Sequence, residues 1–196
     1  MTDSERNAYY DNKHQGYLRM YWEQNDGTDI YRPNGYRDEP GKLFDHFCEQ
    51  ITHDGKVVDL GCGNGLMLRY LMEHTSFTLI PYGVEFLEPS IRQAREIIHP
   101  EYKPHFIVCN IVDYEYKDAP FDFVFANPHY IHPEDMAGFL YSVLSNCADG
   151  GRVVFYTYHD ALEHYDYSWV GEFPGVSELT LVRRDYPGVS FGIYDK

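Results

Sequence analysis

The sequence predicts a single α/β domain with a doubly wound, mostly parallel β-sheet, helices on both faces and an antiparallel C-terminal strand. Its 196 residues lie within the single-domain range. Between residues 56 and 158, strand-like segments alternate with amphipathic helical ones, which is typical of parallel strands joined by helices. Near the C-terminus two strand-like segments flank Pro187-Gly188, so these strands are expected to be antiparallel.

The first 38 residues are rich in aromatic side chains but show no sustained helical or strand period. We therefore expect an irregular N-terminal arm that packs through its rings and covers the site described below. The rings of this arm are Tyr9, Tyr10, Tyr17, Tyr21, Trp22, Tyr31 and Tyr36.

Elements of the core follow from hydrophobic spacing and turn residues. Pro40 is suited to the first turn of a helix, and apolar residues recur at helical spacing until Asp54-Gly55. Further helices are predicted over residues 66–74, 89–99 and from 133 to about 149. Strands are predicted over residues 56–60, 77–84, 105–109, 121–126, 152–158, 178–184 and 189–194.

Charge and composition exclude several classes of protein. Sixteen Lys and Arg against 31 Asp and Glu give a net charge of -15, which disfavours a freestanding nucleic-acid binder or a partner of anionic membranes. No apolar run reaches bilayer length and Met1 leads into polar sequence, so we expect a cytoplasmic protein. Four dispersed cysteines without a CxxC pair are expected to be reduced.

A glycine loop follows the first predicted strand. Its residues are Asp59, Leu60, Gly61, Cys62, Gly63, Asn64 and Gly65. Glycines at the carboxyl end of a strand allow a tight turn and a close approach to a ligand. The G-x-G-x-G spacing differs from the G-x-G-x-x-G of dinucleotide-binding loops because Leu66 follows, and no G-K-[ST] sequence of a P-loop is present.

The loop and its strand resemble the hh[DE]hGxGxG motif of class I S-adenosylmethionine-dependent methyltransferases. The resemblance extends from about residue 40 to the C-terminus. It implies S-adenosyl-L-methionine as the cofactor, no required metal, and a Rossmann-like core of seven strands over residues 39–196. With the arm of residues 1–38, this core makes one methyltransferase domain over residues 1–196.

Further residues of this sequence match positions that bind the cofactor in this family. Glu85 ends the second strand, where the family has an acidic residue that binds the ribose hydroxyls, and Phe86 matches a position that packs on adenine. Asn110 stands where the family usually has an Asp that contacts the adenine amino group. The implied cofactor ligands are Asp59, Gly61, Cys62, Gly63, Asn64, Gly65, Glu85, Phe86, Asn110, Ile111 and Asn127.

The residues after the fourth predicted strand resemble the [DN]PP[YF] motif of methyltransferases that modify planar nitrogens. The sequence here is Asn127-Pro128-His129-Tyr130, with His129 in place of the second Pro. In such a site, a side-chain oxygen and the Pro carbonyl accept two N–H bonds while the aromatic ring stacks on the acceptor. Asn127, Pro128 and Tyr130 are thus the catalytic candidates, and His129 is a candidate substrate contact or base.

The histidines near this motif allow a metal-site interpretation. His129, His132 and Asp135, with His159 and His164, could be ligands, but zinc usually needs three or four well-placed ligands. Polar loop residues at the mouth of the pocket are the favoured interpretation.

The sequence thus predicts an S-adenosyl-L-methionine-dependent methyltransferase that acts on a nitrogen of a small molecule or polypeptide. One alternative is an adenine N6 nucleic-acid methyltransferase whose basic partner supplies the phosphate contacts that this acidic chain lacks. The other is a non-catalytic scaffold subunit that keeps the cofactor pocket.

Overall fold

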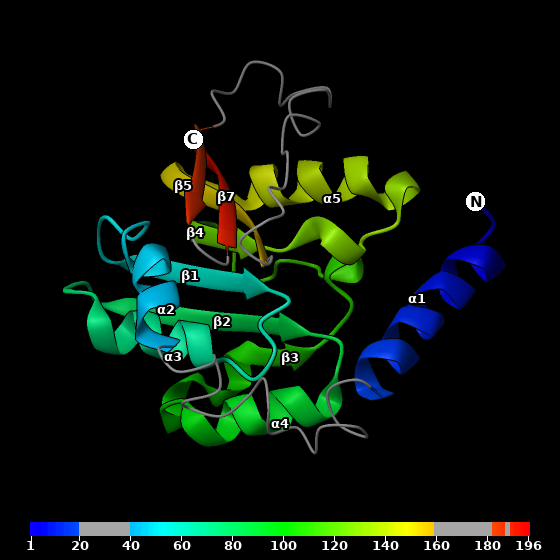
Figure 1. The fold of residues 1–196 in the computed structure, drawn as a ribbon, viewed down its shortest axis with the longest axis horizontal. Coiled ribbons are helices and arrows are strands. Elements are labelled where there is room, and N and C mark those ends of the chain that lie inside the picture. Colours follow the sequence, from blue (N-terminus) through cyan, green and yellow to red (C-terminus); the bar gives the residue numbers. More distant parts are fainter. Residues whose placement is uncertain (20–39, 159–181, 187–188) are drawn as a thin grey trace.

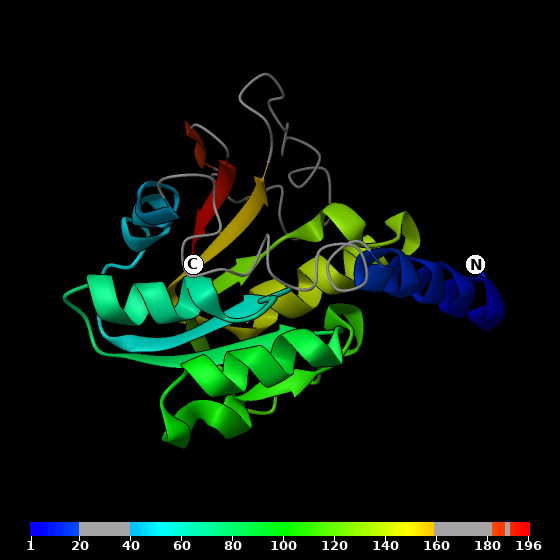
Figure 2. The same cartoon turned by 60° about the horizontal axis from the view of Figure 1, so that its bottom comes forward.

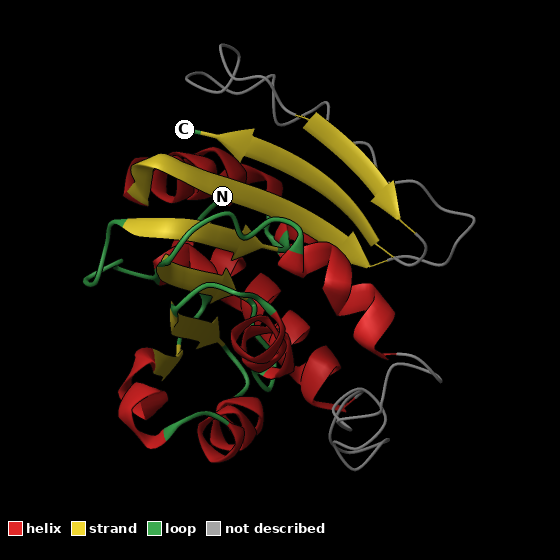
Figure 3. Cartoon of the chain, turned by 90° about the vertical axis from the view of Figure 1, so that its left-hand side faces the viewer, coloured by secondary structure: helices red, strands yellow, loops and turns green. Residues whose placement is uncertain are grey.

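A twisted mixed β-sheet is the centre of the molecule in the computed structural model, which describes residues 1–19, 40–158, 182–186 and 189–196. The sheet order is β3-β2-β1-β4-β5-β7-β6, and Figure 3 shows its twist. Strands β3, β2, β1, β4 and β5 are parallel, and β7 is antiparallel to both β5 and β6. The predicted fold class is therefore confirmed. The strands are β1 (Gly55–Leu60), β2 (Leu79–Glu85), β3 (Phe106–Val108), β4 (Phe121–Ala126), β5 (Cys147–Tyr158), β6 (Val182–Tyr186) and β7 (Val189–Asp195).

Helices cover both faces of the sheet and define two apolar layers. One layer joins α2 (Pro40–Cys48), α3 (Leu66–His74) and α4 (Glu88–Ile97) to the sheet, and Figure 2 shows α3 and α4 on the same side. The other layer contains α5 (Pro133–Asn146) and the segment after β3. Alternate residues of a strand point to opposite faces, so Val57 belongs to the first layer and Val58 to the second.

The N-terminal segment differs from the irregular arm expected from its sequence. Residues Asp3–Leu18 form an α-helix, α1, which begins with a capping box in which Thr2 and Glu5 satisfy each other's backbone N–H groups. No residue of α1 is fully buried, and its inner face carries tyrosines rather than an aliphatic stripe. The usual hydrophobic period is therefore absent although the helix is present. The other rings of the arm, from Tyr21 onward, lie outside the described residues.

Several boundaries differ from prediction, and those of α2, α5 and β5 differ most. Helix α2 ends at Cys48 rather than near Asp54. A turn follows, in which the Gln50 and Ile51 N–H groups donate to carbonyl oxygens three residues back. Helix α5 ends at Asn146, and β5 begins at Cys147 instead of residue 152. Residue 147 pairs with Phe121, and the register shifts before the next pair, so the glycine pair at 150–151 lies in an irregular strand rather than in a helix-ending turn.

Candidate active site

The carboxyl ends of β1, β2 and β4 meet at one edge of the sheet and carry the predicted site. Asp59 lies near the end of β1, Glu85 ends β2, and Asn127 follows β4. Because these neighbouring strands are parallel, their ends converge although they are far apart in sequence. Figure 1 shows α1 across this edge, beyond the arrowheads of β1 and β2.

The glycine loop adopts backbone conformations that only glycine takes easily. Gly61, Gly63 and Gly65 have φ of 97°, 53° and 74°. The Gly61 N–H donates to the Val84 carbonyl, 2.8 Å away, which fixes the loop to β2. A Cβ at Gly65 would meet the Ala94 Cβ of α4 at 3.1 Å. The loop therefore needs glycine for both its turn and its close packing.

Two buried carboxylates lie beneath this loop. The Glu85 carboxylate accepts hydrogen bonds from the backbone N–H groups of Gly63 (3.2 Å) and Leu87 (2.9 Å). Asp59 accepts a bond from the Tyr156 hydroxyl at 3.1 Å. Burial raises the pKa of each carboxyl to about 7, because the charged form loses its hydration. Ionisation of these two carboxyls is therefore unfavourable in the ligand-free protein, and a cationic ligand nearby would favour their charged forms.

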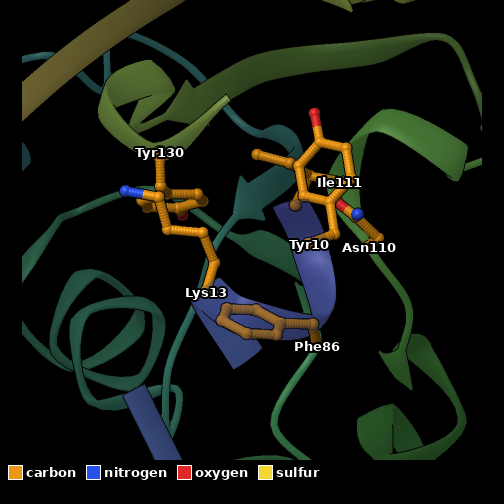
Figure 4. Close-up of a pocket in the computed structure, with 6 residues that line it drawn as sticks. All are labelled: Tyr10, Lys13, Phe86, Asn110, Ile111 and Tyr130. Atoms are coloured by element: carbon orange, nitrogen blue, oxygen red, sulfur yellow. The ribbon is translucent and has the colours of Figure 1, made fainter. Parts of the chain in front are cut away.

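A pocket opens beside these acids, with about 300 Å³ of empty space that includes open solvent. Figure 4 shows its six lining side chains, which come from α1 and from the segments after β2, β3 and β4. They are Tyr10, Lys13, Phe86, Asn110, Ile111 and Tyr130.

Asn110 has a structural task in addition to its predicted one. Its side-chain oxygen accepts a hydrogen bond from the Val112 N–H at 3.4 Å and caps the short 3-10 helix η3 (Ile111–Asp113). An amide oxygen has two lone pairs, so it can still accept a hydrogen bond from a ligand amino group. Ile111, the next residue, is buried.

The segment after β4 reaches the glycine loop. Residues Pro128–Tyr130 form the 3-10 helix η4, and the Tyr130 hydroxyl stands so close to Gly61 that a Cβ there would overlap it. Pro128 is buried and Asn127 is half-buried. His129 is part of η4, and its side chain lies outside the described part of the chain. The two predicted motifs are thus brought into contact through Tyr130.

Polar contacts attach α1 to the site. The Arg6 guanidinium donates to Asp113 of η3 (2.8 Å) and to Asp135 of α5 (3.0 Å), and these bonds raise its pKa further. The Tyr10 hydroxyl also donates to Asp135, at 2.7 Å. The Tyr9 hydroxyl donates to the Tyr130 carbonyl oxygen at 3.3 Å. One helix therefore bridges the segments after β3 and β4.

The sequence also allowed a metal site that includes His132 and Asp135. Both side chains have hydrogen-bond partners within the protein. His132 is the N-cap of α5 and accepts the Glu134 N–H at 3.2 Å. Asp135 accepts the bonds from α1. Within the described residues, no group of three or more metal-ligating side chains is found. His159 and His164 lie outside them.

The sequence analysis expected Tyr10 and Tyr17 to cover the site but missed Arg6, Lys13 and the helix that carries them. Arg6, Tyr10, Lys13 and Tyr17 follow one another at spacings of three or four residues, which is one face of a helix. Together with the Thr2–Glu5 capping box, this spacing was an available signal. It was hidden because the face is made of polar-tipped rings and cations rather than aliphatic residues.

Comparison with known proteins agrees with this geometry. A family model described as a methyltransferase domain matches residues 57–151, the stretch that contains the glycine loop, both acids and η4. Residues 57–151 thus match a methyltransferase domain. Tocopherol O-methyltransferase from Arabidopsis thaliana is 29% identical over 106 residues, which are 53% of this chain and 30% of that protein. The chain thus spans about a third of the length of this curated relative.

Solved structures share the fold of this chain. A Pyrococcus horikoshii protein superposes with a TM-score of 0.64 at 20% identity, covering 90% of this chain and 98% of that one. The Burkholderia thailandensis 1,6-didemethyltoxoflavin N1-methyltransferase, solved with its substrate and S-adenosylhomocysteine, has a TM-score of 0.67 at 15% identity, covering 100% and 91%. At such low sequence identities the structural similarity shows the fold alone. The acceptor must be inferred from the residues of the site.

Proposed function

We propose that this protein is an S-adenosyl-L-methionine-dependent methyltransferase that modifies a nitrogen of a small molecule or polypeptide. The observation that carries the proposal is the meeting of the two motifs, with Tyr130 of the acceptor segment placed on Gly61 of the glycine loop. A cofactor over the loop and an acceptor beside Asn127 would then be neighbours. Methyl transfer requires this proximity, since donor and acceptor must react in line.

The residues present fit the cofactor. The three glycines of the loop carry no side chains and leave room for a ligand against the backbone, and Glu85 offers a carboxylate of the kind that binds ribose hydroxyls. Phe86 and Asn110 offer a ring and an amide oxygen for adenine. The buried Asp59 and Glu85 favour a positive charge nearby. When bound, S-adenosyl-L-methionine supplies a methyl group activated by its sulfonium.

Asn127, Pro128 and Tyr130 act on the acceptor in this proposal. The Asn127 side-chain oxygen and the Pro128 carbonyl accept hydrogen bonds from a planar amino or amide nitrogen, which aims its lone pair at the methyl group. The Tyr130 ring flanks the acceptor plane, and His129 is the candidate acceptor for the departing proton. Other hydrogen-bond donors would bind less well, because the two accepting oxygens match an NH2 group.

The acidic surface guides the choice of acceptor class. With a net charge of -15, the chain supplies few phosphate contacts, so a small molecule or polypeptide is favoured over a nucleic acid acting without a basic partner. Among the described residues, no helix is both long and apolar enough to cross a bilayer. In this proposal helix α1, the described part of the N-terminal arm, covers the site and selects the acceptor.

Cofactor binding is the first test. Calorimetric titration with S-adenosylmethionine and S-adenosylhomocysteine is expected to show saturable binding, which Gly63→Arg abolishes and Glu85→Ala weakens. Gly63→Arg would fill the loop, and Glu85→Ala removes the proposed ribose ligand. Absence of binding at millimolar cofactor would contradict the proposal and favour the scaffold alternative.

Acceptor specificity is the second test. Transfer of a labelled methyl group to panels of amines, amides and phenols is expected to favour nitrogen acceptors. Asn127→Ala should reduce transfer far more than it weakens binding of S-adenosylhomocysteine. Asn146→Ala, whose side-chain amide donates a hydrogen bond within α5, is the matched control. Turnover confined to phenolic oxygens would overturn the nitrogen assignment.

A further inference from the structure

We propose that helix α1 forms the outer wall of the nucleoside subsite, with Lys13 as a cofactor-binding residue that the methyltransferase motifs do not include. The inference rests on the proposed function, because it assumes that the adenosine of the cofactor occupies the pocket beside Phe86 and Asn110. It adds a binding residue from a segment 73 positions before Phe86 in the sequence.

The shape of the pocket supports this assignment. Phe86, Asn110 and Ile111 come from the segments after β2 and β3, and they enclose the pocket from the core. Tyr10 and Lys13, one helical turn apart on α1, close it from outside (Figure 4). A ligand that fills this pocket must therefore touch α1.

Contacts of α1 with the site position the helix that carries Lys13. Its ammonium lies 5.5 Å from the centre of the Tyr9 ring, at cation–π distance. Rings further along α1 pack on the floor of the pocket, since His14 and Tyr17 make edge contacts with Phe86 at 5.3 and 5.9 Å. The bonds from Arg6 to Asp113 and Asp135 fix the N-terminal half of the helix.

The chemistry of Lys13 suits a nucleoside. Its alkyl stem offers apolar surface to a flat base, and its ammonium can donate to a ring nitrogen or to a ribose oxygen. Among the side chains that line the pocket, Lys13 is the cation, whereas Asn110 can accept a hydrogen bond. A base with both an amino group and unprotonated ring nitrogens, such as adenine, matches this pair.

Titration of Lys13→Ala with two ligands tests the inference. S-adenosylhomocysteine and adenosine share the nucleoside, but only the former carries the amino-acid end. We expect the dissociation constants of both ligands to rise roughly tenfold and by a similar factor, as for the loss of one or two buried contacts. Lys117→Ala, at an exposed lysine paired with Glu115, is the matched control and should bind as the unaltered chain does.

Folding does not confound this comparison. Lys13 is half-buried in a helix without fully buried residues, and alanine is the better helix former. Equal affinity of the Lys13→Ala variant and the unaltered chain for both ligands would overturn the inference, and so would weaker binding of S-adenosylhomocysteine alone, which would place Lys13 at the amino-acid end. If the unaltered chain bound neither ligand, the proposed function itself would fail.

Discussion

Replacing Asp59 by Asn is expected to stabilise the ligand-free protein while weakening its affinity for the cofactor. Asp59 is 2% exposed, and its pKa is raised from 3.8 to about 7 by burial, while the Tyr156 hydroxyl bond partly opposes that rise. Asparagine keeps the oxygen that accepts this bond but carries no charge. The variant therefore removes the buried charge and changes little else.

The expected magnitude follows from the two pKa values. Between pH 4 and 7 the unfolded chain loses the Asp59 proton while the folded chain keeps it, so the free energy of unfolding falls as pH rises through this interval. At about 1.4 kcal/mol per pH unit, the cost reaches about 4 kcal/mol at pH 8. At pH 4.5 the same cost is only about 1 kcal/mol, because this pH lies less than one unit above the unfolded pKa of 3.8, while the folded side chain still keeps its proton.

Urea unfolding at pH 4.5 and pH 8 measures this difference. Asp59→Asn is expected to gain up to about 4 kcal/mol over the unaltered chain at pH 8 and much less at pH 4.5. Asp149→Asn is the control, since that side chain is fully exposed and its ion pair with Lys196 is a surface one. A variant no more stable than the unaltered chain at pH 8 would refute the reasoning.

Two further variants test the glycine loop and α1. Gly61→Ala should cost about 1–2 kcal/mol because φ is 97°, and more because the new Cβ overlaps the Tyr130 hydroxyl. Adding Tyr130→Phe should restore part of the loss in urea unfolding. Arg6→Ala should raise the hydrogen exchange rate of α1 amides about tenfold without changing the core, since it removes the bonds to Asp113 and Asp135.

Clear outcomes would contradict each of these expectations. If Tyr130→Phe restored nothing in the Gly61→Ala background, the close approach of the hydroxyl would not contribute. If α1 exchanged at the same rate in Arg6→Ala, its attachment would depend on the tyrosine contacts alone.

Local chemistry determined much of the fold and of the cofactor half of the site from sequence alone. Gly61, Gly63 and Gly65 adopt left-handed backbone conformations, which residues with side chains disfavour. The loop can therefore be recognised from the spacing of its glycines in the sequence. Helix α3 and strand β4 have their predicted bounds, because apolar period and turn residues act over a few positions. The position of Glu85 in the site was predicted from its place at the end of the second strand.

Contacts between distant segments could be decided only by the tertiary structure. The Tyr156–Asp59 hydrogen bond joins residues 97 positions apart, and Arg6 reaches Asp135 across 129 positions. The sequence around one partner does not indicate the other, because such a hydrogen bond forms only when the fold brings two distant segments together. The prediction of an irregular segment in place of helix α1 was wrong for the same reason. The inner face of α1 consists of polar-tipped rings, and their role is apparent only from their contacts with the pocket.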